Sequence, residues 1–164
     1  MIEVPTSVSS LFVEAGWHPG RRVSVDPSVP ASHPAAPILA QFAGLTVGDT
    51  GTGEECARSD LAFRQLCPDD PIVSTWEELL HTQLFGVADV HHAHGELYVD
   101  SSGRCFGRSC IHDAFYFEGA SFAEAVERLL LGRRSRPMLR PGQETVRLYG
   151  EVFTANHPSV YQYR

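Results

Sequence analysis

The stretch "GVADVHHAHGELYVDSSGRCFGRS", residues 86–109, indicates the fold most directly, because apolar runs and turn residues alternate along it. With its flanks it contains three strand-like runs, "LFGVAD" (84–89), "ELYVD" (96–100) and "RCFGRS" (104–109). The last two are joined by "DSSG" (100–103), whose glycine can adopt the positive φ of a tight turn. Such short connections join antiparallel neighbours, so we expect a meander at the centre of a sheet.

Helical patterns lie on both sides of this meander. Apolar spacing in residues 7–17 and 34–44 predicts two helices, each with a glycine near its end. Ser-x-x-Glu at residues 74–77 is a capping box and predicts the start of a third helix. A second capping box opens a closing helix over residues 121–132, with glycine as its stop. The order predicts the α+β class, with a mostly antiparallel central sheet flanked by helices.

The remaining segments give shorter signals. Strands are expected in residues 21–27, 45–48, 61–67 and 145–153, a polar loop in 49–58, and a basic connector in 133–144. Trp17 follows Gly16, the glycine that ends the first predicted helix. We therefore expect Trp17 to be largely buried, and Trp17→Ala to cost about 3–5 kcal/mol.

Composition and charge limit the function classes. The 164 residues suit a single domain spanning the whole chain. All 13 basic residues are arginine, so lysine chemistry is excluded, including Schiff bases and a phosphate-binding loop at residues 48–55. The net charge is −7, with four arginines against 14 acids in residues 1–103 and nine against six in 104–164. The N-terminus has no signal-peptide pattern and no apolar run could span a bilayer, which predicts a cytoplasmic protein.

Four blocks of sequence carry a family resemblance. They are "LFVEAGWHPGRRV" (11–23), "ILAQFAGLTVG" (38–48), "LFGVAD…HGELYVDSSGRCFG" (84–107) and "ASFAEAVERLLLG" (120–132). In this order and spacing the chain resembles the SUKH superfamily, and most closely its third subgroup, over roughly residues 10–132. Residues 133–164, a basic linker and C-terminal extension, lie outside the resemblance.

The resemblance implies a function. Bacterial members of this superfamily are mostly cytoplasmic immunity proteins of polymorphic toxin systems, and they share no catalytic residues. We therefore expect a non-enzymatic protein without a cofactor that binds a cognate toxin domain and occludes its active site. That toxin is expected to be a nuclease or a nucleic-acid deaminase, so the chain itself needs to contact neither nucleic acid nor a membrane. The alternative is an intracellular scaffold or regulatory module of the same fold.

Charge alone suggests the contact residues. An acidic inhibitor complements the positive cleft of a protein that acts on nucleic acid, and complementary charge speeds association. The candidates precede or begin the third predicted helix and are Glu54, Glu55, Asp60, Asp69, Asp70, Glu77 and Glu78. We expect reversal of the last four to leave the fold intact, since exposed charges add little stability. The alternative is that these acids only keep the chain soluble.

Three of the eight histidines fall within residues 91–94. They are His91, His92 and His94. His94-Gly95-Glu96 matches half of the zinc-deaminase signature, but the Pro-Cys-x-x-Cys half is missing, which argues against that activity. Two of these histidines with Cys105 or Cys110 could hold a structural metal. Because no tight ligand spacing is present, we expect no metal and solvent-facing imidazoles at the edge of a strand.

Overall fold

The computed structural model describes residues 1–67 and 69–164. The helices are α1 (Ser9–Glu14), α2 (Ala35–Phe42), α3 (Pro71–Leu80) and α4 (Phe122–Leu131). The strands are β1 (Thr46–Val47), β2 (Gly51–Thr52), β3 (Ala57–Arg58), β4 (Leu61–Phe63), β5 (Phe85–Val90), β6 (Gly95–Val99), β7 (Cys105–Ser109), β8 (Phe115–Gly119), β9 (Arg136–Met138), β10 (Thr145–Leu148) and β11 (Glu151–Thr154). The predicted α+β class is confirmed.

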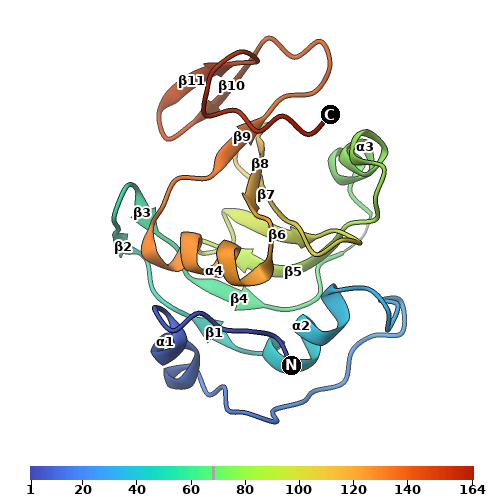
Figure 1. The fold of residues 1–164 in the computed structure, drawn as a ribbon, viewed down its shortest axis with the longest axis vertical. Coiled ribbons are helices and arrows are strands. Elements are labelled where there is room, and N and C mark those ends of the chain that lie inside the picture. Colours follow the sequence, from blue (N-terminus) through green and yellow to red (C-terminus); the bar gives the residue numbers. More distant parts are fainter. Residues whose placement is uncertain (68) are drawn as a thin grey trace.

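Seven of the described strands form one large antiparallel sheet in the order β1-β4-β5-β6-β7-β8-β9 (Figure 1). The predicted meander is confirmed as β5, β6 and β7, in which Leu97 pairs with Ala88 on one side and Gly107 on the other. The hairpins β2–β3 and β10–β11 lie outside this sheet, at the left and the top of Figure 1. The large sheet is therefore the frame on which both hairpins are placed.

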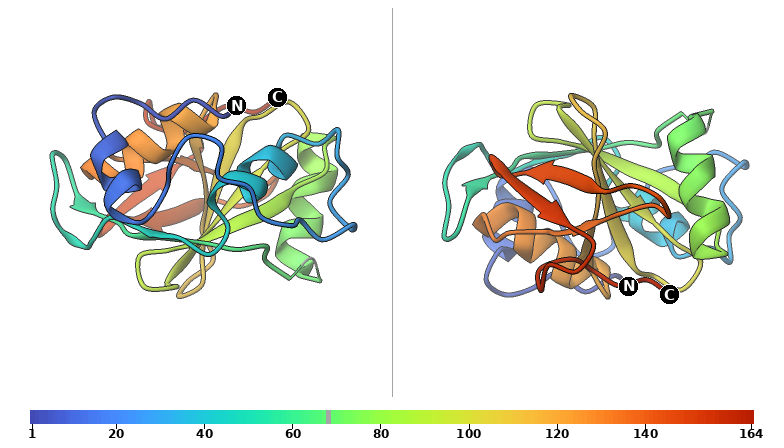
Figure 2. Two further views of the ribbon diagram at one scale, coloured as in Figure 1. Left: turned by 90° about the horizontal axis from the view of Figure 1, so that it is seen from below. Right: turned by 90° about the horizontal axis from the view of Figure 1, so that it is seen from above.

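Helices cover the two faces of the sheet with separate cores (Figure 2). Phe12 of α1, Phe42 of α2 and Val126 of α4 pack in one core with Leu97. Trp76 of α3 packs in the other core, with side chains of β6, β7 and β8. Because successive strand residues point to opposite faces, one strand supplies both cores. The sheet is consequently buried on both sides across its centre.

The ends of α4 follow the prediction, whereas the start of α3 does not. Ser121 caps α4 and accepts a hydrogen bond from the Glu124 N–H at 3.2 Å. Helix α3 begins at Pro71, three residues before the predicted capping box. The Asp70 carboxylate caps it and accepts from the Ile72 N–H at 2.9 Å. An aspartate cap followed by proline at the first helical position is a sufficient start signal, so the box at Ser74 is not used.

Other strand predictions need correction. The predicted strand at residues 21–27 has no strand pairing in the described chain. The segment is bound to α2 instead: the Val23 N–H donates to the Ala40 carbonyl at 2.8 Å, and the Arg21 guanidinium donates to the Gln41 and Ala43 carbonyls. The predicted loop at 49–58 contains the hairpin β2–β3. The predicted connector contains β9, and the predicted strand at 145–153 is the hairpin β10–β11. Strand β8 had not been predicted.

The segment after β11 closes the outer edge of the large sheet. The Tyr161 N–H donates to the Pro137 carbonyl of β9 at 2.9 Å, and the Arg136 guanidinium donates to the Val160 carbonyl at 3.1 Å. The Tyr161 ring stacks on Phe117 of β8 with centroids 4.0 Å apart. The C-terminal segment thus lies along the last strand rather than away from the sheet.

The two tryptophans differ in burial. Trp76 is 1% exposed and stacks on Phe115 with ring centroids 4.8 Å apart. Trp17 is partly buried against the core that contains Phe42, with ring centroids 6.2 Å apart, so it is less deeply buried than Trp76. Within residues 1–67 and 69–164, no helix combines the length and apolarity that a bilayer span requires.

Candidate partner-binding site

The first two candidate acids, Glu54 and Glu55, form hydrogen bonds with the C-terminal end of α4. Residues 54–56 turn beneath the helix, and their N–H groups donate to the Leu131 and Gly132 carbonyls at 2.8–2.9 Å. These bonds satisfy carbonyls that the helix end leaves without an intrahelical partner. The Glu54 carboxylate accepts from Arg133 at 2.7 Å, and that of Glu55 accepts from the Arg134 N–H at 3.4 Å. Part of this acidic charge is therefore neutralised within the protein.

Asp60 holds the histidine turn between β5 and β6. Its carboxylate accepts from the His92 N–H at 2.9 Å, and its backbone carbonyl accepts from the His91 N–H at 3.0 Å. His91, His92 and Ala93 all have positive φ angles, between 53° and 64°. The turn is thus fixed by Asp60 in a conformation that side chains other than glycine seldom adopt.

The four remaining candidates lie at α3. Asp70 caps the helix and forms an ion pair with Arg108, while the Glu77 carboxylate accepts from the Leu84 N–H at 2.9 Å. Asp69 and Glu78 are exposed. The expectation that all four acids can be reversed without disturbing the fold is therefore wrong for Asp70 and Glu77. Their reversal would disturb α3.

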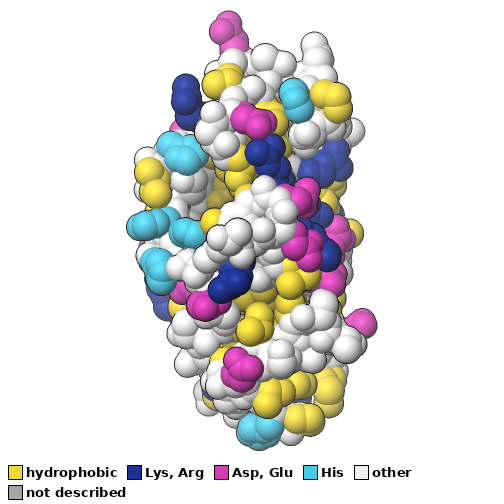
Figure 3. Space-filling view, turned by 90° about the vertical axis from the view of Figure 1, so that its left-hand side faces the viewer, with side chains coloured by type: hydrophobic (Ala, Val, Ile, Leu, Met, Phe, Trp, Pro, Cys, Tyr) yellow, Lys and Arg dark blue, Asp and Glu magenta, His cyan; other side chains and the backbone are white. Residues whose placement is uncertain are grey.

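The seven acids do not share one surface. The β2–β3 hairpin and α3 lie on opposite sides of the molecule in all three views of Figures 1 and 2. Glu54 and Glu55 are therefore far from the acids of α3. On the face that Figure 3 shows, acidic and arginine side chains alternate rather than forming an acidic patch.

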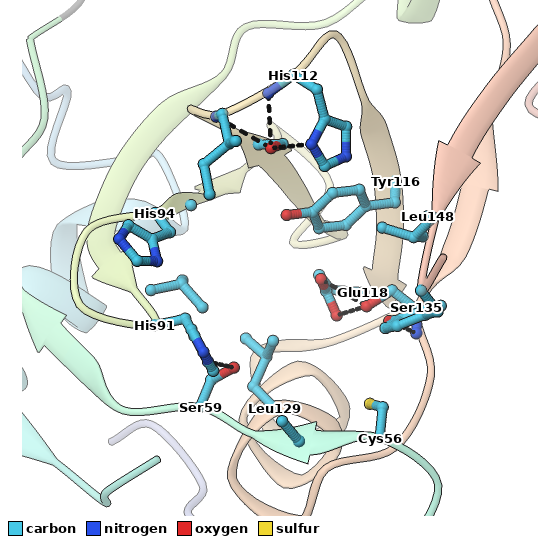
Figure 4. Close-up of a pocket in the computed structure, with 16 residues that line it drawn as sticks. Cys56, Ser59, His91, His94, His112, Tyr116, Glu118, Leu129, Ser135 and Leu148 are labelled. Carbon is cyan, nitrogen blue, oxygen red and sulfur yellow. Dashed lines mark hydrogen bonds between the residues drawn. The ribbon is translucent and has the colours of Figure 1, made fainter. Parts of the chain in front are cut away.

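A pocket of about 370 Å³ opens beside the histidine turn (Figure 4). Its walls come from the β5–β6 turn, the β7–β8 connection, β8, α4 and the β2–β3 hairpin, and from residues 135, 148 and 149 of the C-terminal extension. Apolar wall residues include Val90, Leu129 and Leu148. Apolar walls with a few polar groups are typical of binding sites.

Two side chains of β8 give the pocket its chemistry. Tyr116 and Glu118 are two residues apart, so both point to the same face of the strand. Gly107 on the neighbouring strand β7 makes room for them, because a Cβ there would lie 2.0 Å from Tyr116 Cε2 and 2.7 Å from Glu118 Oε1. Figure 4 shows the Tyr116 hydroxyl directed into the pocket and Glu118 on the wall between Tyr116 and Leu129.

The Glu118 carboxylate is almost completely buried, at 1% exposure. The Ser135 hydroxyl lies 2.8 Å from each of its oxygens. Burial raises the pKa of Glu118 to about 7, against smaller lowering effects of the Ser135 hydrogen bond and the charge of Arg128. Burial also raises the pKa of Tyr116 well above its ordinary value. The pocket wall therefore carries a carboxylate that ionises near neutral pH.

Histidines and one exposed aliphatic residue form the mouth of the pocket. His91, His94 and His112 line it, and Ile111 is 68% exposed beside them. Histidine side chains gather along one edge of the face in Figure 3. The His91 ring is 3.3 Å from the Ser59 hydroxyl, and the His112 ring is 3.4 Å from the Ser109 hydroxyl. In residues 1–67 and 69–164, no three His, Cys, Asp or Glu side chains are grouped so that they could hold a metal ion.

Comparison with known proteins identifies the family. The sequence model of the SUKH-3 immunity protein matches residues 4–132, well over half of the chain. The chain belongs to the SUKH-3 immunity protein family. Searches of curated proteins and of solved structures returned no match. Membership suggests an immunity function and implies a toxin protein as partner, and proteins of this family are generally non-enzymatic.

The SUKH-3 match ends before the pocket is complete. Val90, Tyr116, Glu118 and Leu129 lie inside residues 4–132, whereas the residues from the extension lie outside. Sequence reasoning missed Tyr116 and Glu118. The alternation of "FYFEG" in residues 115–119 could have revealed their strand and their shared face. The contribution of the extension depends on a tertiary contact that has no local signal.

Proposed function

We propose that this chain is a bacterial cytoplasmic immunity protein that binds a cognate polymorphic toxin domain and occludes its active site. The observation that carries the proposal is the SUKH-3 match across residues 4–132. Occlusion requires a contact of ordinary size, about 800 Å² on each partner. Inhibition by a bound protein needs no catalytic group on the inhibitor.

The charge of the chain supports a toxin that acts on nucleic acid, either a nuclease or a deaminase. Such a toxin holds phosphates in a positively charged cleft. A chain with a net charge of −7 is attracted to that cleft and gains association rate. We retain the seven acids as the proposed acidic contribution, with Asp69 and Glu78 as the direct contacts at α3, since both are exposed there. The other five acids form hydrogen bonds or ion pairs within the chain, and they contribute only to the long-range electrostatic attraction between the two proteins.

The test is to isolate the partner of this chain from its native strain by pull-down and then to co-express the chain with that toxin domain. We expect the chain to restore growth, to co-purify as a 1:1 complex, and to block toxin activity in proportion to complex formed. An unrelated toxin domain serves as the control and should remain active. Growth arrest in the presence of folded chain would contradict an immunity function, and a stable complex that retains full toxin activity would contradict occlusion.

A further inference from the structure

We propose that the pocket lined by Glu118 receives a single arginine or lysine side chain of the bound toxin domain. This inference rests on the proposed function and specifies one contact within it. The pocket combines a buried carboxylate, apolar walls and an open mouth. Each of these features matches one part of a long basic side chain.

The first argument is the unfilled hydrogen-bonding capacity of Glu118. A serine hydroxyl has one proton, so the two contacts of Ser135 share a single donor and leave most of the acceptor capacity of the carboxylate unused. The neighbouring arginines direct their terminal nitrogens elsewhere: Arg128 donates through Nη1 to the Arg134 carbonyl at 2.6 Å and through Nη2 to Glu124 at 3.1 Å, and its buried Nε makes no hydrogen bond to Glu118. Arg134 pairs with Glu151 at 3.2 Å. A cation from outside the chain would therefore supply the missing donor.

The second argument is the fit of the walls. At about 370 Å³ the pocket is at the small end of the range for ligand sites, which suits one long side chain better than a helix or a peptide. Leu129, Leu148 and Val90 can cover the methylene stem of an arginine or lysine. The Tyr116 hydroxyl can accept a hydrogen bond, and its ring can face the cation.

The third argument is the composition of the mouth. Ile111, exposed at 68%, provides an apolar contact at the rim. The other titratable groups that line the pocket are Cys56, His91, His94, His112, Tyr116 and Tyr149. A rim that excludes water around one buried charged contact is the arrangement found at interface hot spots.

The last argument concerns specificity. The residues 135, 148 and 149 that complete the pocket lie outside the segment matched by the SUKH-3 family. The site is thus assembled from the family domain and from a part of this chain beyond it. A pocket built in this way would distinguish the toxin of this chain from toxins bound by other members.

The experiment has two measurements, both at pH 8, where Glu118 is ionised. In the first, methylguanidinium is titrated into the isolated chain while the imidazole NMR signals of His91, His94 and His112 are followed. We expect saturable shifts in the wild type, none with urea as the neutral control, and none in Glu118→Gln. Glu144→Gln removes an exposed charge of the extension outside the pocket and should behave as wild type.

In the second measurement, toxin binding is compared by surface plasmon resonance. We expect Glu118→Gln to weaken binding at least 10-fold, mainly through faster dissociation, because a buried charge pair is lost. Tyr116→Phe keeps the ring and should weaken binding less. Glu144→Gln should stay within about twofold of wild type, since a peripheral charge mainly changes the association rate.

The outcomes separate this inference from the proposed function. A toxin affinity that is unchanged in folded Glu118→Gln overturns the inference and leaves the immunity function standing. Probe shifts that persist in Glu118→Gln overturn it as well, because the cation would then bind elsewhere. Failure of the wild type to bind the toxin contradicts the proposed function and removes the toxin as the source of the cation.

Discussion

Burial of Glu118 disfavours the ionised form of its carboxyl group. The Ser135 hydroxyl and the charge of Arg128 only partly replace the water that the carboxylate loses on burial, so ionisation inside the fold is unfavourable. Its pKa is raised from 4.5 to about 7. Below pH 4.5 the carboxyl is protonated in both the folded and the unfolded chain, so it adds no dependence on pH there. Between these values the unfolded chain loses its proton first, and the folded state is progressively disfavoured.

The first prediction follows from this sign. The free energy of unfolding should fall as pH rises from about 4.5 to 7 and then level off, with a contribution from Glu118 on the order of 3 kcal/mol. Glu118→Gln should remove this part of the pH dependence and be more stable than wild type at pH 8. Urea denaturation of wild type and Glu118→Gln at pH 5 and pH 8 measures this difference in the free energy of unfolding. Parallel pH profiles for the two proteins would show that Glu118 is not desolvated.

The second prediction compares the two tryptophans. Trp76→Ala removes a fully buried ring that stacks on Phe115, and should cost about 3–5 kcal/mol. Trp17→Ala removes a half-buried ring and should cost about 1–2 kcal/mol, because less apolar surface returns to water. Urea denaturation of the two variants gives both values. Equal losses would mean that Trp17 is as deeply packed as Trp76.

Residue burial was only partly predictable from the sequence. Trp76 lies in a helical apolar pattern with the correct spacing, and its burial follows from that pattern. Trp17 comes after the helix, where periodicity no longer defines a face. Glu118 reads as a surface residue, since glutamate is seldom buried. Its environment arises from Ser135 and Gly107, which lie in other elements.

At the scale of elements, the end of α4 and the β2–β3 turn form one unit. Gly132 ends the helix with a φ of 71°. A Cβ at this glycine would lie 2.4 Å from the Cys56 carbonyl oxygen and 2.7 Å from Gly53 Cα. Glycine is therefore required both for the left-handed backbone and for the close approach of the turn.

The third prediction tests this unit. Gly132→Ala should cost about 2–3 kcal/mol, because it adds left-handed strain to displacement of the turn. Gly142 also has a positive φ, 80°, but no atom lies within 4 Å of its ideal Cβ. Gly142→Ala should therefore show the strain alone, about 1 kcal/mol. Thermal unfolding of the pair checks this, and equal losses would show that the turn tolerates the methyl group.

Elements were predictable where their signals are local. Ser121 and Gly132 mark the ends of α4 in the sequence as in the structure, because capping depends on neighbouring residues. Residues 21–27 alternate like a strand, yet Arg21 binds the end of α2, and alternation alone does not provide a pairing partner. The short strands β2, β3 and β9 depend on contacts with distant segments, which composition does not show.

At the scale of the whole molecule, the acids divide into those that hold the fold and those that are exposed. The sequence indicates an excess of negative charge in residues 1–103, but not how it is distributed in space. Arg133 and Arg108, both from the basic part of the chain, pair with Glu54 and Asp70. The two parts are therefore complementary within the chain.

The fourth prediction separates the two kinds of acid. Asp69→Arg with Glu78→Arg should leave the melting temperature nearly unchanged and slow toxin association, with an effect that fades at high salt. Asp70→Arg with Glu77→Arg should lower the melting temperature, because it removes the cap of α3 and places a cation beside Arg108. Calorimetry and binding kinetics measure both. Unchanged association after reversal of Asp69 and Glu78 would show that these acids are not contacts.

The segment along β9 bears on how the chain avoids self-association. An open strand edge can recruit the edge of another copy and begin aggregation. Here Tyr161 occupies the Pro137 carbonyl, and proline itself offers no N–H to an incoming strand. Deleting residues 159–164 would expose this edge together with the Phe117 ring. Such a shortened protein should form higher-order species in light scattering, whereas the full chain should not.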